Sequence, residues 1–321
     1  MKRTLALLLS AALLLTLAAC KIIKDPVIVT KPDTSTTTAA APVQAGLPTL
    51  AGALANWAWG VSNGTADDPA THLALTGYAK DCDFARLDLA VGRFGPAKVS
   101  FAGEKQGDDS IEPWYFADYD RVTGPYFAFE KPIAVTTWQP AFFLVDADAM
   151  GGGLVPLVQS ERFAGGDDAP YYPPASKEDN ARAGALHPGR GVAESQLLAA
   201  SEDGARVCMF RYENLPDDAL FSIVCFDGAK MLAIDYTTDY VDEDGAWWRV
   251  DMEPDDVGLL EPVLLCRTQE GVLLIVTWVA PEGMLELVLR EQGGALEAFS
   301  LGGWGYDPWE DEYYLNEYEG D

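Results

Sequence analysis

The sequence predicts a mainly β fold built from antiparallel strands, and two observations support this prediction. Short runs rich in β-branched and aromatic residues recur through the second half of the chain, and Asp-Gly, Glu-Gly or Gly-Gly pairs separate them. In one such run Leu285, Leu287 and Leu289 alternate with other residues and therefore share one face of a strand. Helix signals are few, so helices are expected to be a minor part of the fold.

The predicted strands group into meanders. The clearest predicted strands are 84–91, 97–102, 205–212, 219–226, 230–237 and 272–279. The last is apolar throughout, which is typical of a central strand covered on both faces. Two stretches, 196–237 and 261–301, each read as a four-stranded antiparallel meander. Meanders of similar size favour a propeller-like fold, and a β-sandwich is the alternative.

Two segments do not follow this pattern. Residues 192–201 are compatible with a short helix, and their second half is equally compatible with a strand. Residues 160–194 form a long loop with no strand signal, which in a compact domain is either functional or disordered. This loop gathers cationic and aromatic candidates for binding an anionic group, unless they pair with acids of the same loop. The candidates are Tyr171, Tyr172, Arg182, His187 and Arg190.

The N-terminal residues have the pattern of a secretory signal peptide. Lys2 and Arg3 precede an uncharged apolar run that ends at Ala19. The stretch Leu17-Ala18-Ala19-Cys20 resembles the lipobox of bacterial membrane lipoproteins. The resemblance covers only these first residues. It implies cleavage before Cys20, attachment of lipid with acyl chains such as palmitate to Cys20, and an extracytoplasmic location at the cell membrane.

Three parts of the chain are therefore expected. They are a signal peptide over 1–19, a lipidated Cys20 with a flexible tether over 20–50, and a single β-rich extracytoplasmic domain over 51–321. The tether is rich in Thr, Ala and Pro, a composition that cannot bury a core. Val27-Ile28-Val29 is a candidate for a short added strand within it.

The charge of the chain restricts its partners. Fifty acidic residues oppose 22 basic residues, which gives a net charge of −28. Nucleic-acid phosphates would be repelled, so no nucleic-acid partner is expected. A glycan or protein partner stays open, as does the oligomeric state, and the membrane is reached through the N-terminal lipid.

Besides Cys20 the chain has four cysteines, Cys82, Cys208, Cys225 and Cys266. Cys208 and Cys225 lie on two predicted strands of one hairpin, so a disulfide and a pair of buried free thiols are both open. The chain has no CxxC pair, which argues against a cysteine zinc site.

Catalytic motifs give little support for an enzyme. The string Gly60-Val61-Ser62-Asn63-Gly64 matches GxSxG, but a loop rather than a helix is expected after it. His72 and His187 are the only histidines, and no nucleotide-binding motif occurs, so no cofactor is predicted. Carboxylates are abundant, but a glycosidase needs two at a set separation, which sequence cannot supply.

Aromatic residues beside acids are the remaining candidates for binding. The stretches 111–120 and 306–321 both contain an acid-Pro-Trp sequence, and Tyr and Trp rings stack on sugars. They supply Trp114, Tyr119 and Trp309. An acidic stretch with Asp239, Asp242 and Asp244 resembles part of a calcium loop, but a hairpin turn with solvated acids is the favoured interpretation, so no metal is predicted.

Together these observations predict a non-catalytic, lipid-anchored binding or scaffold module of the cell envelope. Two alternatives are an envelope glycan hydrolase that uses carboxylates and a factor that assembles envelope proteins.

Overall fold

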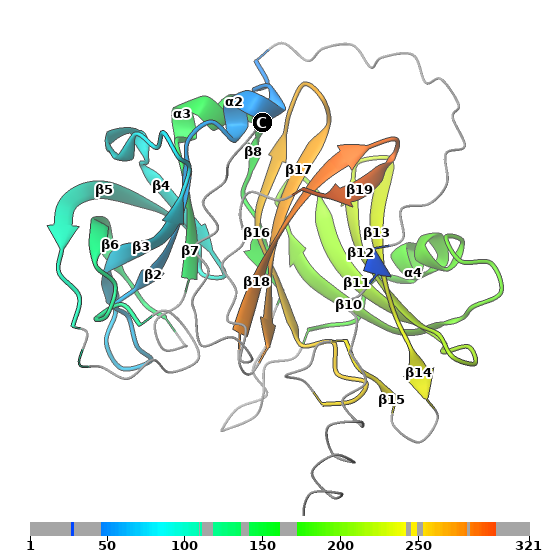
Figure 1. The fold of residues 1–321 in the computed structure, drawn as a ribbon. Coiled ribbons are helices and arrows are strands. Elements are labelled where there is room, and N and C mark those ends of the chain that lie inside the picture. The colour runs from blue at the N-terminus through cyan, green and yellow to red at the C-terminus, as the bar shows by residue number, and fades with distance from the viewer. Residues whose placement is uncertain are drawn as a thin grey trace, which may run out of the picture.

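The computed structural model is mainly β, with 54% of the residues that it describes in strands and 10% in helices, which confirms the predicted class. The residues that it describes are 27–28, 46–108, 110, 118–135, 141–160, 172–241, 245–248, 253–280 and 283–299. The strands form a closed barrel, a six-stranded sheet, a five-stranded sheet and one two-stranded ribbon, and the pairing between strands is antiparallel (Figure 1).

Six strands from the first half of the chain close the barrel in the order β2-β3-β6-β5-β4-β7. Their bounds are β2 Trp57–Ser62, β3 Ala70–Tyr78, β4 Leu89–Gly92, β5 Gly95–Lys105, β6 Gly124–Ile133 and β7 Ala141–Val145. Alternate residues such as Ala58, Phe142 and Leu144 point into the barrel and join its hydrophobic cluster. The barrel was not predicted from the sequence.

The six-stranded sheet has the order β1-β13-β12-β11-β10-β9. Its strands are β1 Val27–Ile28, β9 Val158–Gln159, β10 Val192–Ala200, β11 Arg206–Tyr212, β12 Ala219–Asp227 and β13 Lys230–Thr238. The predicted meander over 196–237 is confirmed as β10 to β13. The strand alternative for 192–201 is therefore correct and the helix alternative is wrong. The tight turn between β12 and β13 places Gly228 at φ 58°, a conformation that favours glycine.

The five-stranded sheet has the order β19-β18-β17-β16-β8. Its strands are β8 Leu154–Val155, β16 Leu259–Arg267, β17 Val272–Ala280, β18 Gly283–Gln292 and β19 Ala295–Ala298, and the separate ribbon pairs β14 Tyr240–Val241 with β15 Gly245–Ala246. β17 is the predicted strand with two covered faces. Its Leu274 and Val276 face the six-stranded sheet, whereas Leu273 and Ile275 face the barrel.

The two sheets pack face to face on one large hydrophobic cluster. Four aromatic rings form its centre. Phe221 of β12 stacks on Tyr236 at 4.9 Å and meets the edges of Trp248 and Trp278 at 4.8 and 5.6 Å. The buried indole of Trp278 donates a hydrogen bond to Val257 O at 2.6 Å. The propeller-like arrangement is not confirmed, because both predicted meanders are parts of larger sheets that share this cluster.

The barrel packs on the other face of the five-stranded sheet. Trp57, Trp59 and Phe143 of the barrel join one cluster with residues of β16, β17 and β18. A buried ion pair crosses the same interface. Arg93, in the turn between β4 and β5, lies 3.0 Å from Glu261 of β16, and the two side chains are 9% and 10% exposed. The layers are therefore barrel, five-stranded sheet and six-stranded sheet in that order.

Short helices complete the described fold, namely α2 Leu50–Ala53, η1 Phe84–Arg86, α3 Ala147–Met150, η2 Gly151–Gly153 and α4 Lys177–Gly184. α4 corrects the expectation that 160–194 is an irregular loop. Its Ala183 is fully buried and packs on the outer face of the six-stranded sheet. No helix among the described residues has both the length and the apolarity to cross a membrane.

Candidate functional site

Three of the predicted binding residues lie beside the six-stranded sheet, Arg182 within α4 and His187 and Arg190 in the segment between α4 and β10. Ser176 begins this helix as its N-cap, because its hydroxyl accepts a hydrogen bond from the Asp179 N–H at 3.0 Å. The Ser176 hydroxyl in turn donates a hydrogen bond to the Asp179 carboxylate at 2.8 Å. This reciprocal cap explains why a helix starts in a segment with few apolar residues.

Asp179 also fixes α4 to the sheet. Its side chain is 1% exposed, and the Arg206 guanidinium of β11 donates two hydrogen bonds to it, at 3.0 and 2.8 Å. Burial alone would raise the pKa of Asp179. The hydrogen bonds from Arg206 and Ser176 outweigh burial, so the pKa lies below its usual value.

The predicted cationic residues engage the sheet rather than acids of their own segment. Arg182 donates to the carbonyl groups of Ala229 and Lys230, and its guanidinium lies 4.8 Å from the centre of the Phe226 ring. Arg190 forms a close ion pair with Asp218. Neither of the two alternatives for this loop, a free anion site or pairing within the loop, describes these contacts.

His187 belongs to a polar cluster with Asp235 and Ser222. Its Nε2 lies 3.3 Å from Asp235 Oδ1, and the buried Ser222 hydroxyl donates to the same oxygen at 2.5 Å. The carboxylate therefore lies between the serine and the histidine. In a catalytic triad the histidine is in the middle and takes the serine proton, so this order does not activate Ser222.

Tyr212 forms the apolar side of this cluster. Its ring meets His187 edge-on at 4.6 Å, and its hydroxyl donates to Ala183 O at 3.2 Å. Burial raises the pKa of Tyr212 to about 12, so the hydroxyl is a neutral donor at physiological pH. Tyr212 thus ties the end of α4 to β11.

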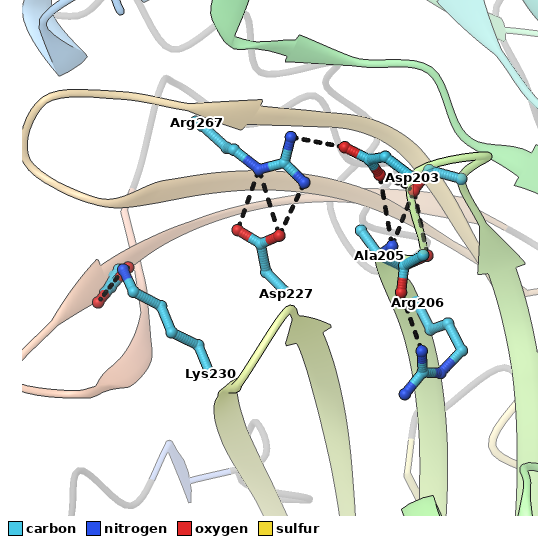
Figure 2. A network of polar contacts seen from close by, with 9 residues as sticks. Asp203, Ala205, Arg206, Asp227, Lys230 and Arg267 are labelled. Carbon is cyan, nitrogen blue, oxygen red and sulfur yellow. Dashed lines mark hydrogen bonds and ion pairs between the residues drawn. The ribbon is translucent and has the colours of Figure 1, made fainter. Parts of the chain in front are cut away.

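A second charged network joins the two sheets at one end (Figure 2). Arg267, the last residue of β16, donates three hydrogen bonds to Asp227 at 2.8 to 3.2 Å and one to Asp203 at 2.7 Å. Hydrogen bonds from Arg267 and Ser201 lower the pKa of Asp203 to about 2. The same carboxylates raise the pKa of Arg267, so both partners stay charged.

Lys230 and Glu291 make a parallel link between the sheets. The ammonium of Lys230, at the start of β13, lies 2.9 Å from Glu291 of β18 (Figure 2). The carboxylate of Glu291 also accepts the N–H of Val272 at 3.1 Å. Charged side chains from both sheets thus fasten this end of the two-sheet core.

Sequence reasoning did not identify this network, although part of its signal was present. Asp203 and Asp227 belong to the Asp-Gly pairs at the β10–β11 and β12–β13 turns. Alternate turns of a meander lie at the same end of the sheet, so both carboxylates were bound to be neighbours. Arg267 comes from the other sheet, and its pairing with these two carboxylates depends on how the two sheets pack against each other.

The other predicted residues are dispersed. Tyr172 is buried in the core between the sheets rather than displayed for binding. Tyr119 lies beside the barrel, where the Lys105 ammonium is 4.5 Å from its ring centre and donates to its carbonyl oxygen at 2.6 Å. Asp239 is exposed just after β13. Cys20, Trp114, Tyr171, Asp242, Asp244 and Trp309 lie outside the described residues.

The structure answers whether Cys208 and Cys225 form a disulfide. Cys208 pairs with Val224 and Cys225 pairs with Val207, so the two thiols point to opposite faces of the sheet. Cys208 lies in the cluster under α4 and Cys225 in the core between the sheets. Both are buried free thiols, and the disulfide is wrong.

The GxSxG string forms the end of β2 and the start of a loop. Ser62 is fully buried, and the Asn63 side chain binds the Thr71 hydroxyl at 3.0 Å across the hairpin. No nucleophile elbow is formed. The two histidines belong to different layers, His72 to the barrel and His187 to the six-stranded sheet.

A small cavity and the metal-ligating side chains are further candidates for a site among the described residues. A small cavity between the barrel and the five-stranded sheet has a volume of about 10 Å³, which is room for about one water. No group of three or more His, Cys, Asp or Glu side chains in the described part of the chain is placed to hold a metal ion.

Comparison with known proteins identifies no relative, since no protein-family model, curated protein or solved structure matches this chain.

Proposed function

We propose that the protein is a lipid-anchored, extracytoplasmic module of the cell envelope that binds or scaffolds a partner without catalysing a reaction. The location follows from the N-terminal pattern, in which a basic start, an apolar run and Leu17-Ala18-Ala19 lead to Cys20. Two or more acyl chains at one cysteine give stable attachment to a bilayer.

One observation carries the non-catalytic part of the proposal. The cationic side chains that gather on the outer face and at the end of the sheets are each engaged by carboxylates or carbonyl oxygens of another element. Arg206, Arg190 and Arg267 are the clearest cases. Arg206 and Arg190 hold α4 and the residues after it to the six-stranded sheet, and Arg267 joins the two sheets. Cations that are used to hold the fold together suit a module that presents its surface to a partner.

The proposal takes the two facing sheets as a β-sandwich, the alternative to the propeller-like fold, with the barrel as an added layer. The whole chain has a net charge of −28, so we take the surface of the protein to be acidic. A neutral or basic protein, or a glycan, is the class of partner that such a surface accepts. Nucleic acid is not proposed as a partner, since its phosphates would be repelled.

Metabolic labelling with a fatty-acid analogue tests the anchor. Cys20→Ala is expected to abolish the label and release the protein from the membrane fraction. Cys82→Ala removes a different thiol and is expected to keep both the label and the membrane association. Equal labelling of the two variants would contradict the lipid anchor.

Incubation with envelope glycans tests the non-catalytic part. The purified protein is expected to release no new reducing ends from peptidoglycan or other envelope polysaccharides. Their appearance, at a rate that falls when a surface carboxylate is neutralised, would establish the hydrolase in place of the binding module.

A further inference from the structure

The long outer edge of the six-stranded sheet is paired with a strand from the N-terminal segment. β13 pairs with β12 along its whole length, from Lys230 to Thr238. On its other side β1 runs antiparallel to it, with Val27 opposite Thr237 and Ile28 opposite Tyr236 (Figure 1). β1 therefore attaches residues near the start of the chain directly to the folded body.

This edge differs from the opposite edge of the same sheet. The opposite edge is β9, a strand of only two residues, whereas β13 has nine. A long edge strand presents a row of unpaired backbone N–H and C=O groups, which readily take up another extended segment. β13 is thus the longer of the two edges, and the chain itself supplies a two-residue strand that pairs with part of it.

The position of β1 determines how much chain lies between Cys20 and the first contact with the folded body. Seven residue steps separate Cys20 from Val27, a reach of at most about 23 Å. If β1 were not paired, the free segment would extend to Gly46, with a reach of at most about 86 Å.

We infer that β1 is a docking strand that holds the domain close to the bilayer, with the β13 edge as its binding surface. This inference rests on the proposed lipid anchor at Cys20. The segment before β1 acts as a short leash, and the residues between β1 and Gly46 do not add to the distance from the membrane. Lys21 and Lys24 lie within the leash, where their charge suits the anionic surface of a bilayer.

Cross-linking tests the docking without the membrane. In the full chain carrying Cys20→Ala, Val27→Cys combined with Thr237→Cys is expected to form a disulfide under mild oxidation, because paired residues have Cβ atoms about 5 Å apart. Val27→Cys combined with Met231→Cys is the matched control, since Met231 lies on the same strand six residues away. Equal cross-linking of the two pairs would overturn the docking.

A pair of insertions tests the leash. Ten Gly and Ser residues are inserted either after Asp25 or after Thr38 of the lipidated protein, which is bound to vesicles with labelled headgroups. A dye at Val158→Cys, a 65% exposed position, reports energy transfer to the headgroups. Insertion after Asp25 is expected to lower the transfer about twofold, because it adds up to ~33 Å of reach, and insertion after Thr38 is expected to leave it unchanged.

The results separate this inference from the proposed anchor. Equal effects of the two insertions would overturn the leash while leaving the anchor in place. Failure of the lipid-labelled fraction to bind vesicles would overturn the anchor and with it the leash. The cross-linking result decides the docking of β1 in either case.

Discussion

Removing one partner of the ion pair between Arg93 and Glu261 should destabilise the protein, whereas removing both should not. Arg93→Met leaves the Glu261 carboxylate without its cation in the interface between the barrel and the five-stranded sheet. Glu261→Leu leaves the Arg93 guanidinium in the same position. The double variant replaces both charges with apolar side chains in an interface that is already apolar.

The magnitude follows from the burial and the separation of the charges. At 3.0 Å two unit charges attract by about 5 kcal/mol at an effective dielectric constant of 20, and the cost of desolvating them offsets most of this. Both side chains are about nine-tenths buried, so an unpaired charge has little water to solvate it. Each single substitution is therefore expected to lower the free energy of unfolding by about 3 kcal/mol, and the double by less than ~1 kcal/mol.

Urea unfolding of the four proteins, followed by tryptophan fluorescence, measures these differences. Trp57 and Trp59 lie in the same interface and report its loss. The double-variant cycle gives the coupling between the two residues without assuming a value for either alone. Additive losses in the double variant, or single losses below ~1 kcal/mol, would show that the pair is solvated and does not join the layers energetically.

Three further predictions concern the charged network, the helix cap and the barrel. Asp203 has a pKa of about 2 in the folded protein against an ordinary 3.8. Its ionised carboxylate therefore stabilises the fold above about pH 4, and this stabilisation is lost as the pH falls toward 2. Arg267→Gln should flatten this part of the pH dependence of the free energy of unfolding, measured by urea titration, and an unchanged slope would contradict the network. Ser176→Ala should lower the free energy of unfolding by about 1 kcal/mol through loss of the N-cap, measured by thermal unfolding, while Ser176→Thr keeps an acceptor and most of the stability. Gly60→Ala should cost about 1–3 kcal/mol in the same measurement, because its Cβ would lie 2.9 Å from a backbone oxygen, whereas Gly77→Ala on the paired strand has open space and should be nearly neutral.

Local patterns predicted many of the strands because the alternation of side chains along a strand can be recognised from a few consecutive residues. The meander from β10 to β13 and the two-sided burial of β17 were both recognisable in this way. Closure of the barrel was not, since β7 must pair with both β2 and β4. Those contacts join residues more than 50 positions apart, and the local sequence of β7 does not indicate which strands it pairs with.

The candidate site shows the same division between local and distant information. Arg182, His187 and Arg190 were selected because they gather in one segment, and the structure places all three beside the six-stranded sheet. Their partners lie 28 to 48 residues away in sequence. The sequence left both a disulfide and free thiols open for Cys208 and Cys225, because the choice depends on the exact register of the hairpin. In the observed register the two residues lie on opposite faces of the sheet.

The distribution of the four described cysteines has a practical consequence. Cys82 lies at the barrel, Cys266 between the barrel and the five-stranded sheet, Cys225 between the two sheets and Cys208 under α4. Burial raises the pKa of each thiol to about 12. Cys208, Cys225 and Cys266 are buried, so a reagent reaches them only when their surroundings open, whereas Cys82 is partly exposed in the folded protein. The rate at which each of these three buried thiols is modified therefore measures how often its own surroundings open. Variants that keep only one of these three cysteines would therefore show which opens first: the interface between the barrel and the five-stranded sheet, the core between the two sheets, or the contact under α4.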